Sequence, residues 1–90
     1  MKLSAKLKIK NSLGLHTRPA TVIAKLLQAS LSQVMFHYKG DTVNAKSIMS
    51  LLMLAAPKNA VITVTVSGED AEVTMLQLKE VFENRFGECI

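Results

Sequence analysis

The chain has 90 residues, a length that fits one domain over residues 1–90 and lets a core form without metals or disulfides. Nearly half of the residues (49%) are hydrophobic, but only three are Phe and one is Tyr, so we expect an aliphatic core. Cys89 is the only cysteine, which excludes an internal disulfide and a cysteine-based metal cluster and fits a reducing cytoplasm.

The net charge of +4 is unevenly spread along the chain. Residues 1–45 hold seven basic residues and one acidic residue, whereas residues 46–90 hold four basic and six acidic residues. A basic half can attract an anion or an acidic partner, so nucleic acid has to be weighed as a partner. The sequence shows neither a signal peptide nor a run of about 18 apolar residues, so we expect a cytoplasmic protein without membrane insertion.

Residues 2–10 alternate between apolar and polar side chains, which predicts a β-strand with one face in the core and one in water. The lysines of this segment all fall on the polar face, and solvation of that face explains them. The side chains expected to face the core are Leu3, Ala5, Leu7 and Ile9.

A helix is predicted over residues 17–29 because apolar residues recur there at helical spacing. Pro19 falls in the first turn, where its missing N–H would have no intrahelical partner. The apolar residues of this helix are Val22, Ile23, Leu26 and Leu27.

A β-hairpin is predicted next in the chain. Residues 34–39 alternate as a second strand, Gly40-Asp41 forms a tight turn, and residues 42–44 begin a short third strand. His37 alternates outward on the second strand, so we interpret it as a surface histidine without a functional role.

A second helix is predicted over residues 47–54, with Ser47 as its N-cap and with Leu51 and Leu54 on its core side. Residues 57–59 form a loop, in which Asn59 suits a left-handed backbone.

Residues 61–67 alternate as a fourth strand, and a last helix is predicted over residues 70–86. Asp70 and Glu72 suit the positive N-terminus of this helix, and Arg85 suits its negative end. The predicted core stripe consists of Met75, Leu78, Phe82 and Phe86, helped by Leu76. The resulting order βαββαβα predicts an α+β fold, in which three helices cover one face of a four-stranded antiparallel sheet.

His16 is predicted to lie where a loop becomes the first helix. The free N–H groups of a first helical turn, here those of Thr17 and Arg18, can bind an anion. The imidazole of His16, with a guanidinium two residues later, could therefore hold a phosphoryl group on a ring nitrogen. For an arbitrary histidine, capping or packing is the more common role. Here Gly14 lets the loop bend, and small residues at Thr17, Ala20 and Thr21 leave room for a partner protein.

The segment Gly14-Leu15-His16-Thr17-Arg18-Pro19-Ala20, followed by Lys46-Ser47-Ile48-Met49, resembles the histidine-containing phosphocarrier protein family HPr of the phosphoenolpyruvate-dependent phosphotransferase system. The resemblance covers essentially the whole chain and implies an open-faced β-sandwich. It also implies that His16 accepts a phosphoryl group on Nδ1 from enzyme I and passes it to IIA-type acceptor domains. Such a protein is a carrier rather than a turnover enzyme and needs neither a cofactor nor a metal. We expect a monomer.

The second helix is apolar nearly all round, which predicts either a fully buried helix or a partly exposed docking surface. The resemblance assigns Ile48, Met49 and Leu52 to a docking patch beside His16. It also implies that an HPr kinase/phosphorylase can phosphorylate Ser47. Because capping alone also selects serine, both interpretations of Ser47 stay open.

The segment Ala55-Ala56-Pro57-Lys58-Asn59 departs from the family pattern, since many relatives have Gly there. The run Leu54-Ala55-Ala56 is similar to branches devoted to nitrogen control or regulation, so sugar transport and a regulatory branch both stay open. A regulatory protein that acts mainly through protein contacts is the alternative function. We expect no nucleic-acid binding, because the aromatic residues fall at core-facing positions and the lysines on one strand face.

Overall fold

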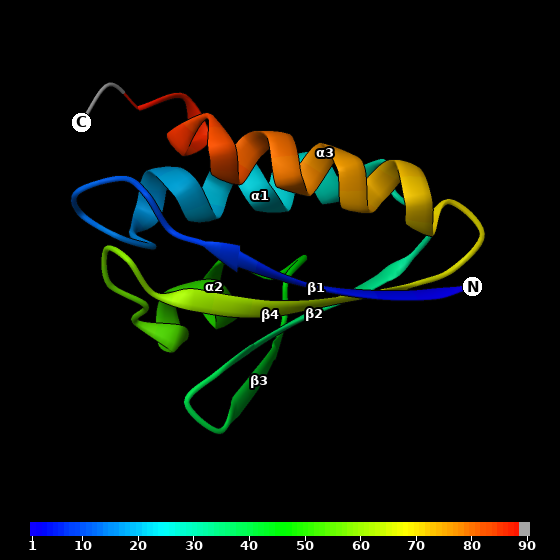
Figure 1. The fold of residues 1–90 in the computed structure, drawn as a ribbon, viewed down its shortest axis with the longest axis horizontal. Coiled ribbons are helices and arrows are strands. Elements are labelled where there is room, and N and C mark those ends of the chain that lie inside the picture. The colour runs from blue at the N-terminus through cyan, green and yellow to red at the C-terminus, as the bar shows by residue number, and fades with distance from the viewer. Residues whose placement is uncertain (89–90) are drawn as a thin grey trace.

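The computed structural model describes residues 1–88, which form a four-stranded sheet and three α-helices in the predicted order (Figure 1). The strands are β1 (Lys2–Lys8), β2 (Gln33–Tyr38), β3 (Asp41–Asn44) and β4 (Val61–Ser67). The helices are α1 (Thr17–Gln28), α2 (Ile48–Leu54) and α3 (Ala71–Glu83), followed by the 3-10 turn η1 (Arg85–Gly87). Cys89 lies outside the described residues.

The sheet has the order β1-β4-β2-β3, and every neighbouring pair is antiparallel. The first strand therefore lies beside the last one in the chain. The apolar residues of the three long strands share one register, since Val66 of β4 lies opposite both Leu3 and Val34. This register brings the predicted inward side chains to a common face.

One face of the sheet is covered by helices, as the sequence predicts. Figure 1 shows α1 and α3 running side by side over the sheet, and α2 packs against α1 and β3. On the other face, Lys2, Lys6 and Lys8 are exposed to water, which confirms the predicted polar face of β1.

The core contains aliphatic side chains from all the sheet's long strands and all the helices, with three aromatic rings at one place. Phe82 of α3 makes edge-to-face contacts with Phe36 of β2 at 5.8 Å and with Phe86 at 4.9 Å between ring centroids. These three rings join α3 and η1 to the sheet.

The last helix differs from its prediction in two ways. α3 ends at Glu83 rather than at residue 86, and Phe86 reaches the core from η1 through a left-handed backbone with φ 56°. Leu76, predicted to help the core stripe, is 58% exposed because it lies on the outer side of α3. Leu76 is next to the core stripe in sequence, but its side chain does not face the sheet.

Two backbone features follow α2. Asn59 adopts the predicted left-handed conformation, with φ 72°. Ala55 ends α2 in a left-handed conformation with φ 50°, a position that usually favours Gly. Residues 55–59, the segment that departs from the family pattern, therefore begin at the end of α2. Among the described residues, no helix is both long and apolar enough to cross a membrane.

Candidate functional site

His16 is the residue immediately before α1, where its extended backbone (φ −101°, ψ −166°) ends the preceding loop. Its carbonyl accepts a hydrogen bond from the Ala20 N–H at 3.0 Å, the first bond of the helix. The loop is fixed against the segment that follows α2, since the Leu15 N–H donates to the Ala56 carbonyl at 2.8 Å. Gly14 fits this close approach with φ 71°, because a Cβ atom there would lie 2.5 Å from the Ala56 oxygen. These contacts therefore fix the position of His16 at the start of α1.

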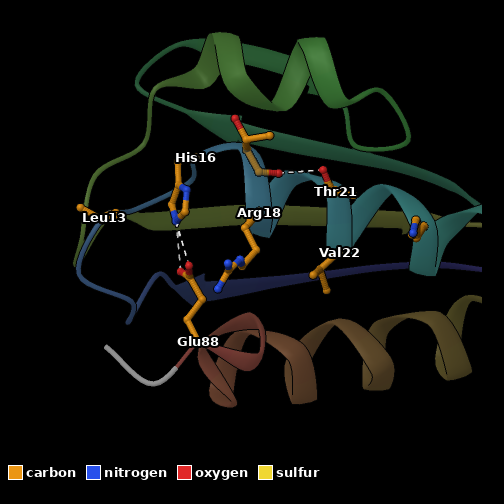
Figure 2. Close-up of a pocket in the computed structure, with 8 residues that line it drawn as sticks. Leu13, His16, Arg18, Thr21, Val22 and Glu88 are labelled. Atoms are coloured by element: carbon orange, nitrogen blue, oxygen red, sulfur yellow. Dashed lines mark hydrogen bonds and ion pairs between the residues drawn. The ribbon is translucent and has the colours of Figure 1, made fainter.

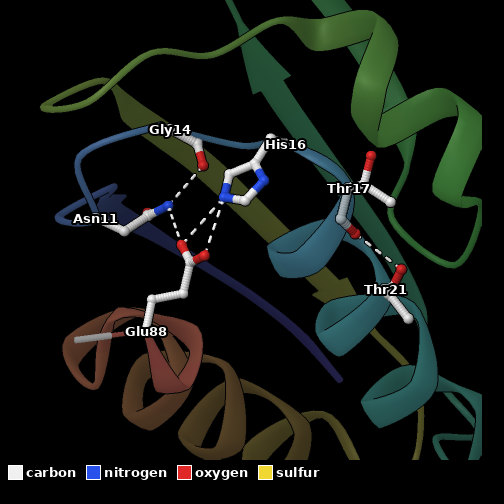
Figure 3. Close-up of polar contacts among 6 residues, drawn as sticks. All are labelled: Asn11, Gly14, His16, Thr17, Thr21 and Glu88. Carbon is white, nitrogen blue, oxygen red and sulfur yellow. Dashed lines mark hydrogen bonds and ion pairs between the residues drawn. The ribbon is translucent and has the colours of Figure 1, made fainter. Parts of the chain in front are cut away.

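The imidazole of His16 is partly accessible, with 32% of its side chain exposed. Nε2 lies 3.1 Å from both carboxylate oxygens of Glu88, a residue that follows η1. The other ring nitrogen, Nδ1, faces the start of α1 at Thr17 (Figure 3). Nδ1 makes no hydrogen bond within residues 1–88, so it is free to bind an incoming group.

The first turn of α1 supplies hydrogen-bond donors beside the ring. The N–H groups of Thr17 and Arg18 have no intrahelical acceptor, as expected at a helix N-terminus. The Thr17 side chain is exposed, and its carbonyl accepts a bond from the Thr21 hydroxyl at 2.8 Å. With the positive end of the helix dipole, these amides make the surroundings of Nδ1 suitable for an anion.

An open pocket of about 690 Å³ lies over this helix start (Figure 2). Arg18 and Lys25 contribute positive charge to it, and Glu88 contributes the negative charge that faces His16. The pocket is lined by Leu13, His16, Thr17, Arg18, Thr21, Val22, Lys25 and Glu88. A phosphoryl group and the surface of a partner protein could both reach the imidazole from this side.

The predicted site residues do not all lie at this surface. His16, Thr17, Arg18 and Thr21 line the pocket together. Ala20, which we expected to contact a partner, is fully buried on the core side of α1. Its side chain packs in the core, so its assignment to the partner-binding surface is wrong.

α2 presents part of its apolar surface to water, which excludes the fully buried alternative. Leu51 and Leu54 are buried, as predicted, whereas Met49 is 72% exposed and Leu52 is half-buried. Met53, which we did not assign to the patch, is 77% exposed. We define the α2 patch as Ile48, Met49, Leu52 and Met53.

Ser47 caps α2, as the sequence predicts. Its hydroxyl oxygen accepts a hydrogen bond from the Ser50 N–H at 3.3 Å, and its residue is partly exposed. The capping role is therefore present in the structure, and the hydroxyl lies at the edge of the α2 patch.

Sequence reasoning missed two polar residues at the site, Glu88 and Asn11. Glu88 is 72 positions from His16, and no local pattern links the two. Asn11 is fully buried and donates from Nδ2 to the Gly14 carbonyl at 2.7 Å and to Glu88 Oε1 at 2.8 Å. Asn11 is close to His16 in sequence, but its partner Glu88 is 77 positions away and no local pattern links the two. Within residues 1–88, no three His, Cys, Asp or Glu side chains converge into a metal-binding cluster.

Comparisons with known proteins cover nearly the whole chain. A family model described as the PTS HPr component phosphorylation site matches residues 3–84. The chain is 48% identical to phosphocarrier protein HPr of Chlamydia muridarum, over 96% of this chain and 83% of that protein. It is 42% identical to phosphocarrier protein HPr of Xylella fastidiosa, over 96% and 97% of the two chains. The fold is similar to crystalline HPr of Thermoanaerobacter tengcongensis, with a TM-score of 0.93, 32% identity, and coverage of 98% of this chain and 99% of that one.

Proposed function

Because the chain belongs to the HPr family of phosphocarrier proteins of the phosphotransferase system, we propose that it carries a phosphoryl group on His16. Phosphorylated enzyme I donates the group, and the histidine or cysteine of a IIA-type domain accepts it. The observation that carries this proposal is the partly exposed imidazole at the start of α1, whose Nδ1 faces the free amides of the first turn. As for other phosphotransferase components, we place this relay in the cytoplasm, with the carrier acting as a monomer.

The chemistry that we propose is a direct exchange between two nucleophiles. The lone pair of Nδ1 forms a bond to phosphorus while the bond from phosphorus to the donor nitrogen of enzyme I breaks, and the electron pair stays on that donor nitrogen. In a second exchange of the same kind, the acceptor nucleophile bonds to phosphorus while the bond from phosphorus to Nδ1 breaks, and the electron pair returns to Nδ1. Neutral imidazole suits this role because one of its two ring nitrogens keeps a free lone pair. What the protein adds is orientation and charge compensation.

The Thr17 and Arg18 amides and the Arg18 guanidinium are the groups that we expect to contact the phosphoryl oxygens. Arg18 is exposed, so solvent weakens each of these contacts. Weak contacts suit a carrier, since a strongly held phosphoryl group would not be passed on.

The α2 patch is the surface that we propose for docking to enzyme I and IIA-type domains, together with Thr21. The patch is apolar, its two methionines, Met49 and Met53, are exposed, and α2 packs beside α1. Flexible methionine side chains adapt to partners of different shape, which suits a carrier with several partners.

Regulation at Ser47 is the finer part of the proposal. The hydroxyl is partly exposed at the edge of the α2 patch, so a phosphate there would place negative charge at the docking surface and repel acidic partners. Incubation with an HPr kinase/phosphorylase and ATP, followed by mapping of the phosphate, tests this point. Absence of phosphate from Ser47 would contradict it.

The alternative function is a regulatory protein that acts mainly through protein contacts, in a nitrogen or carbon control branch. It predicts no need for the imidazole of His16. The segment that departs from the family pattern, residues 55–59, still supports the loop before α1, because the Ala56 carbonyl accepts a bond from the Leu15 N–H, and this contact favours the carrier.

Phosphotransfer from enzyme I and labelled phosphoenolpyruvate separates the two functions. We expect label on the unaltered chain and on His37→Ala, and none on His16→Ala. His37 is a matched control because it is the only other histidine and lies on the sheet, bonded to Thr42 and Thr65. Label that persists on His16→Ala, or an unaltered chain without label, would refute the carrier function.

A further inference from the structure

The chain turns back sharply after α3 and directs Glu88 toward His16. Arg85, Phe86 and Gly87 have consecutive positive φ angles of 52°, 56° and 81°. Two of these residues are not glycine, so the turn is strained and must be held by other contacts. Phe86 supplies one of them, since its ring is buried against Phe82. The fold therefore accepts local strain at the point that sets the direction of Glu88.

The carboxylate of Glu88 is held by two residues of the His16 loop. Its side chain is only 6% exposed, although the residue lies outside the helices and strands, directly after η1. Both oxygens lie 3.1 Å from Nε2 of His16, and Oε1 also accepts a bond from Asn11 Nδ2 at 2.8 Å. The resulting line Asn11–Glu88–His16 is shown in Figure 3.

Asn11 is oriented for this carboxylate. Its neighbours, the Gly14 carbonyl and Glu88 Oε1, are both acceptors, so its NH₂ group must face them. Its own Oδ1 is buried and has no hydrogen-bond partner within residues 1–88. A buried acceptor without a partner is unfavourable, and it is kept here where the amide supports a carboxylate beside the candidate phosphoryl acceptor.

We propose that Glu88 is a positioning residue that holds a proton on Nε2 of His16 and thereby makes Nδ1 the phosphoryl-accepting atom. An ionised carboxylate only accepts hydrogen bonds, so Nε2 must donate and must carry the proton. The lone pair of the neutral ring then lies on Nδ1, the nitrogen that faces the amides of α1. The same logic, with the two nitrogens exchanged, applies to the carboxylate that orients the histidine of a serine protease. The assignment of the proton to Nε2 does not depend on the proposed phosphocarrier function. Only its role in phosphotransfer rests on that function.

Glu88 also suits the charge that the reaction creates. When Nδ1 bonds to phosphorus, the ring keeps its proton on Nε2 and becomes formally positive. The carboxylate already faces that N–H, so it compensates the charge without rearrangement. When the phosphoryl group leaves, its bonding electron pair returns to Nδ1 and the ring is neutral again.

The competing explanation is a purely structural role. In that case the contact with His16 only stabilises the segment that follows α3. The two explanations differ in what they predict for the ring nitrogens. Fastening alone leaves the choice of nitrogen unchanged when Glu88 is replaced, whereas a positioning role does not.

The test uses phosphoramidate, a small reagent that needs no partner protein. A ring nitrogen attacks its phosphorus, the P–N bond breaks, and ammonia leaves. ³¹P and ¹⁵N NMR then identify which nitrogen carries the group, and ¹⁵N shifts of the unmodified ring report the tautomer. The variants are Glu88→Ala and Glu88→Asp, in which a shorter side chain withdraws the carboxylate from Nε2. Glu80→Ala is the matched control, an exposed acid on α3.

We expect phosphorylation at Nδ1 in the unaltered chain and in Glu80→Ala. In both Glu88 variants we expect the ratio of Nδ1 to Nε2 product to fall by about tenfold, with ring shifts moving toward those of a free imidazole. Unchanged product ratio and ring shifts in these variants, or phosphorylation of the unaltered chain at Nε2, would overturn the inference. Failure of enzyme I to phosphorylate the chain would refute the proposed function alone, because the reagent still tests Glu88.

Discussion

His16 is placed by a local turn and by one long-range contact, and Arg18 is placed by its neighbours in the first turn of α1. The Gly14 turn and the bond from Leu15 to Ala56 fix the loop, and the start of α1 then sets the direction of the next residues. Arg18 follows on the first turn, in the same pocket as His16. Its guanidinium is exposed and has no ion pair within residues 1–88, so it does not stabilise the fold through charge pairing.

Replacement of Arg18 by Ala should therefore slow phosphotransfer and leave stability unchanged. One exposed charge-assisted contact to the phosphoryl group is lost, so we expect a rate lower by roughly tenfold. We expect the free energy of unfolding to change by less than about 0.5 kcal/mol. Rapid-quench transfer assays and urea unfolding measure the two quantities.

Arg18→Lys is the control for this experiment, since it keeps the charge but loses the planar fork of donors. It should fall between the unaltered chain and Arg18→Ala in rate. A loss of several kcal/mol of stability in Arg18→Ala would show that Arg18 acts in folding rather than in transfer.

At the scale of elements, Asp70 joins the beginning of α3 to the connection between α1 and β2. Its carboxylate accepts hydrogen bonds from the Ser32 hydroxyl, from the Leu31 N–H at 2.9 Å and from the Ser30 hydroxyl at 3.3 Å. These bonds favour the ionised form: the Ser32 hydroxyl first, then the Leu31 N–H, lower the pKa of Asp70 against a smaller opposing effect of burial. Asp70 was expected to act through the helix dipole, but its side chain makes no capping bond to α3.

The stabilisation from Asp70 should depend on pH in a defined direction. A carboxyl group whose pKa is lower in the folded state stabilises the fold above its ordinary pKa, and that contribution is lost as the pH falls through the folded value. Asp70→Asn should therefore be less stable than the unaltered chain near neutral pH, and the difference should shrink in acid. Urea unfolding near neutral pH and in acid measures this difference in stability. Glu69→Gln is the control, since Glu69 is an exposed neighbour. A difference that is constant with pH would contradict this account.

Helices and strands were predicted correctly where the spacing of apolar residues determines them. They were predicted wrongly where packing between distant residues determines them. Alternation in residues 61–67 and helical spacing in residues 17–29 were sufficient to locate β4 and α1. The end of α3 was predicted wrongly because Phe82 and Phe86 have helical spacing, yet Phe86 reaches the core through a left-handed turn. A hydrophobic period cannot reveal that a buried side chain belongs to a turn.

The candidate site was predictable to the same extent. The position of His16 before a helix, and the donors of Thr17 and Arg18, depend on neighbours in sequence. Glu88 was not predictable, because its contact with His16 depends on three successive left-handed residues, of which only Gly87 favours that conformation.

At the scale of the whole molecule, the aromatic cluster connects the helical layer to the sheet. Phe82 contacts Phe36 on one side and Phe86 on the other, so its ring supports α3, β2 and η1 together. The backbone of η1 sets the direction of Glu88, which contacts His16. The packing of Phe86 therefore also helps to position the His16 site.

Phe82→Ala should remove about 3–5 kcal/mol from the free energy of unfolding, since a large buried ring leaves a cavity. That is a large share of the stability of a small domain. Leu76→Ala is the control on the outer side of α3 and should change stability by less than about 0.5 kcal/mol. Chemical denaturation measures both variants. Equal losses would mean that α3 does not pack as described.

The pairing of β1 with β4 has a consequence for folding during synthesis. Translation runs from the N-terminus to the C-terminus, so residues 2–8 are made before residues 61–67, the strand with which they pair. The nascent β1 therefore has no strand to pair with until β4 has been synthesised. Its lysines are well suited to that interval, because like charges discourage the waiting strand from pairing with another chain.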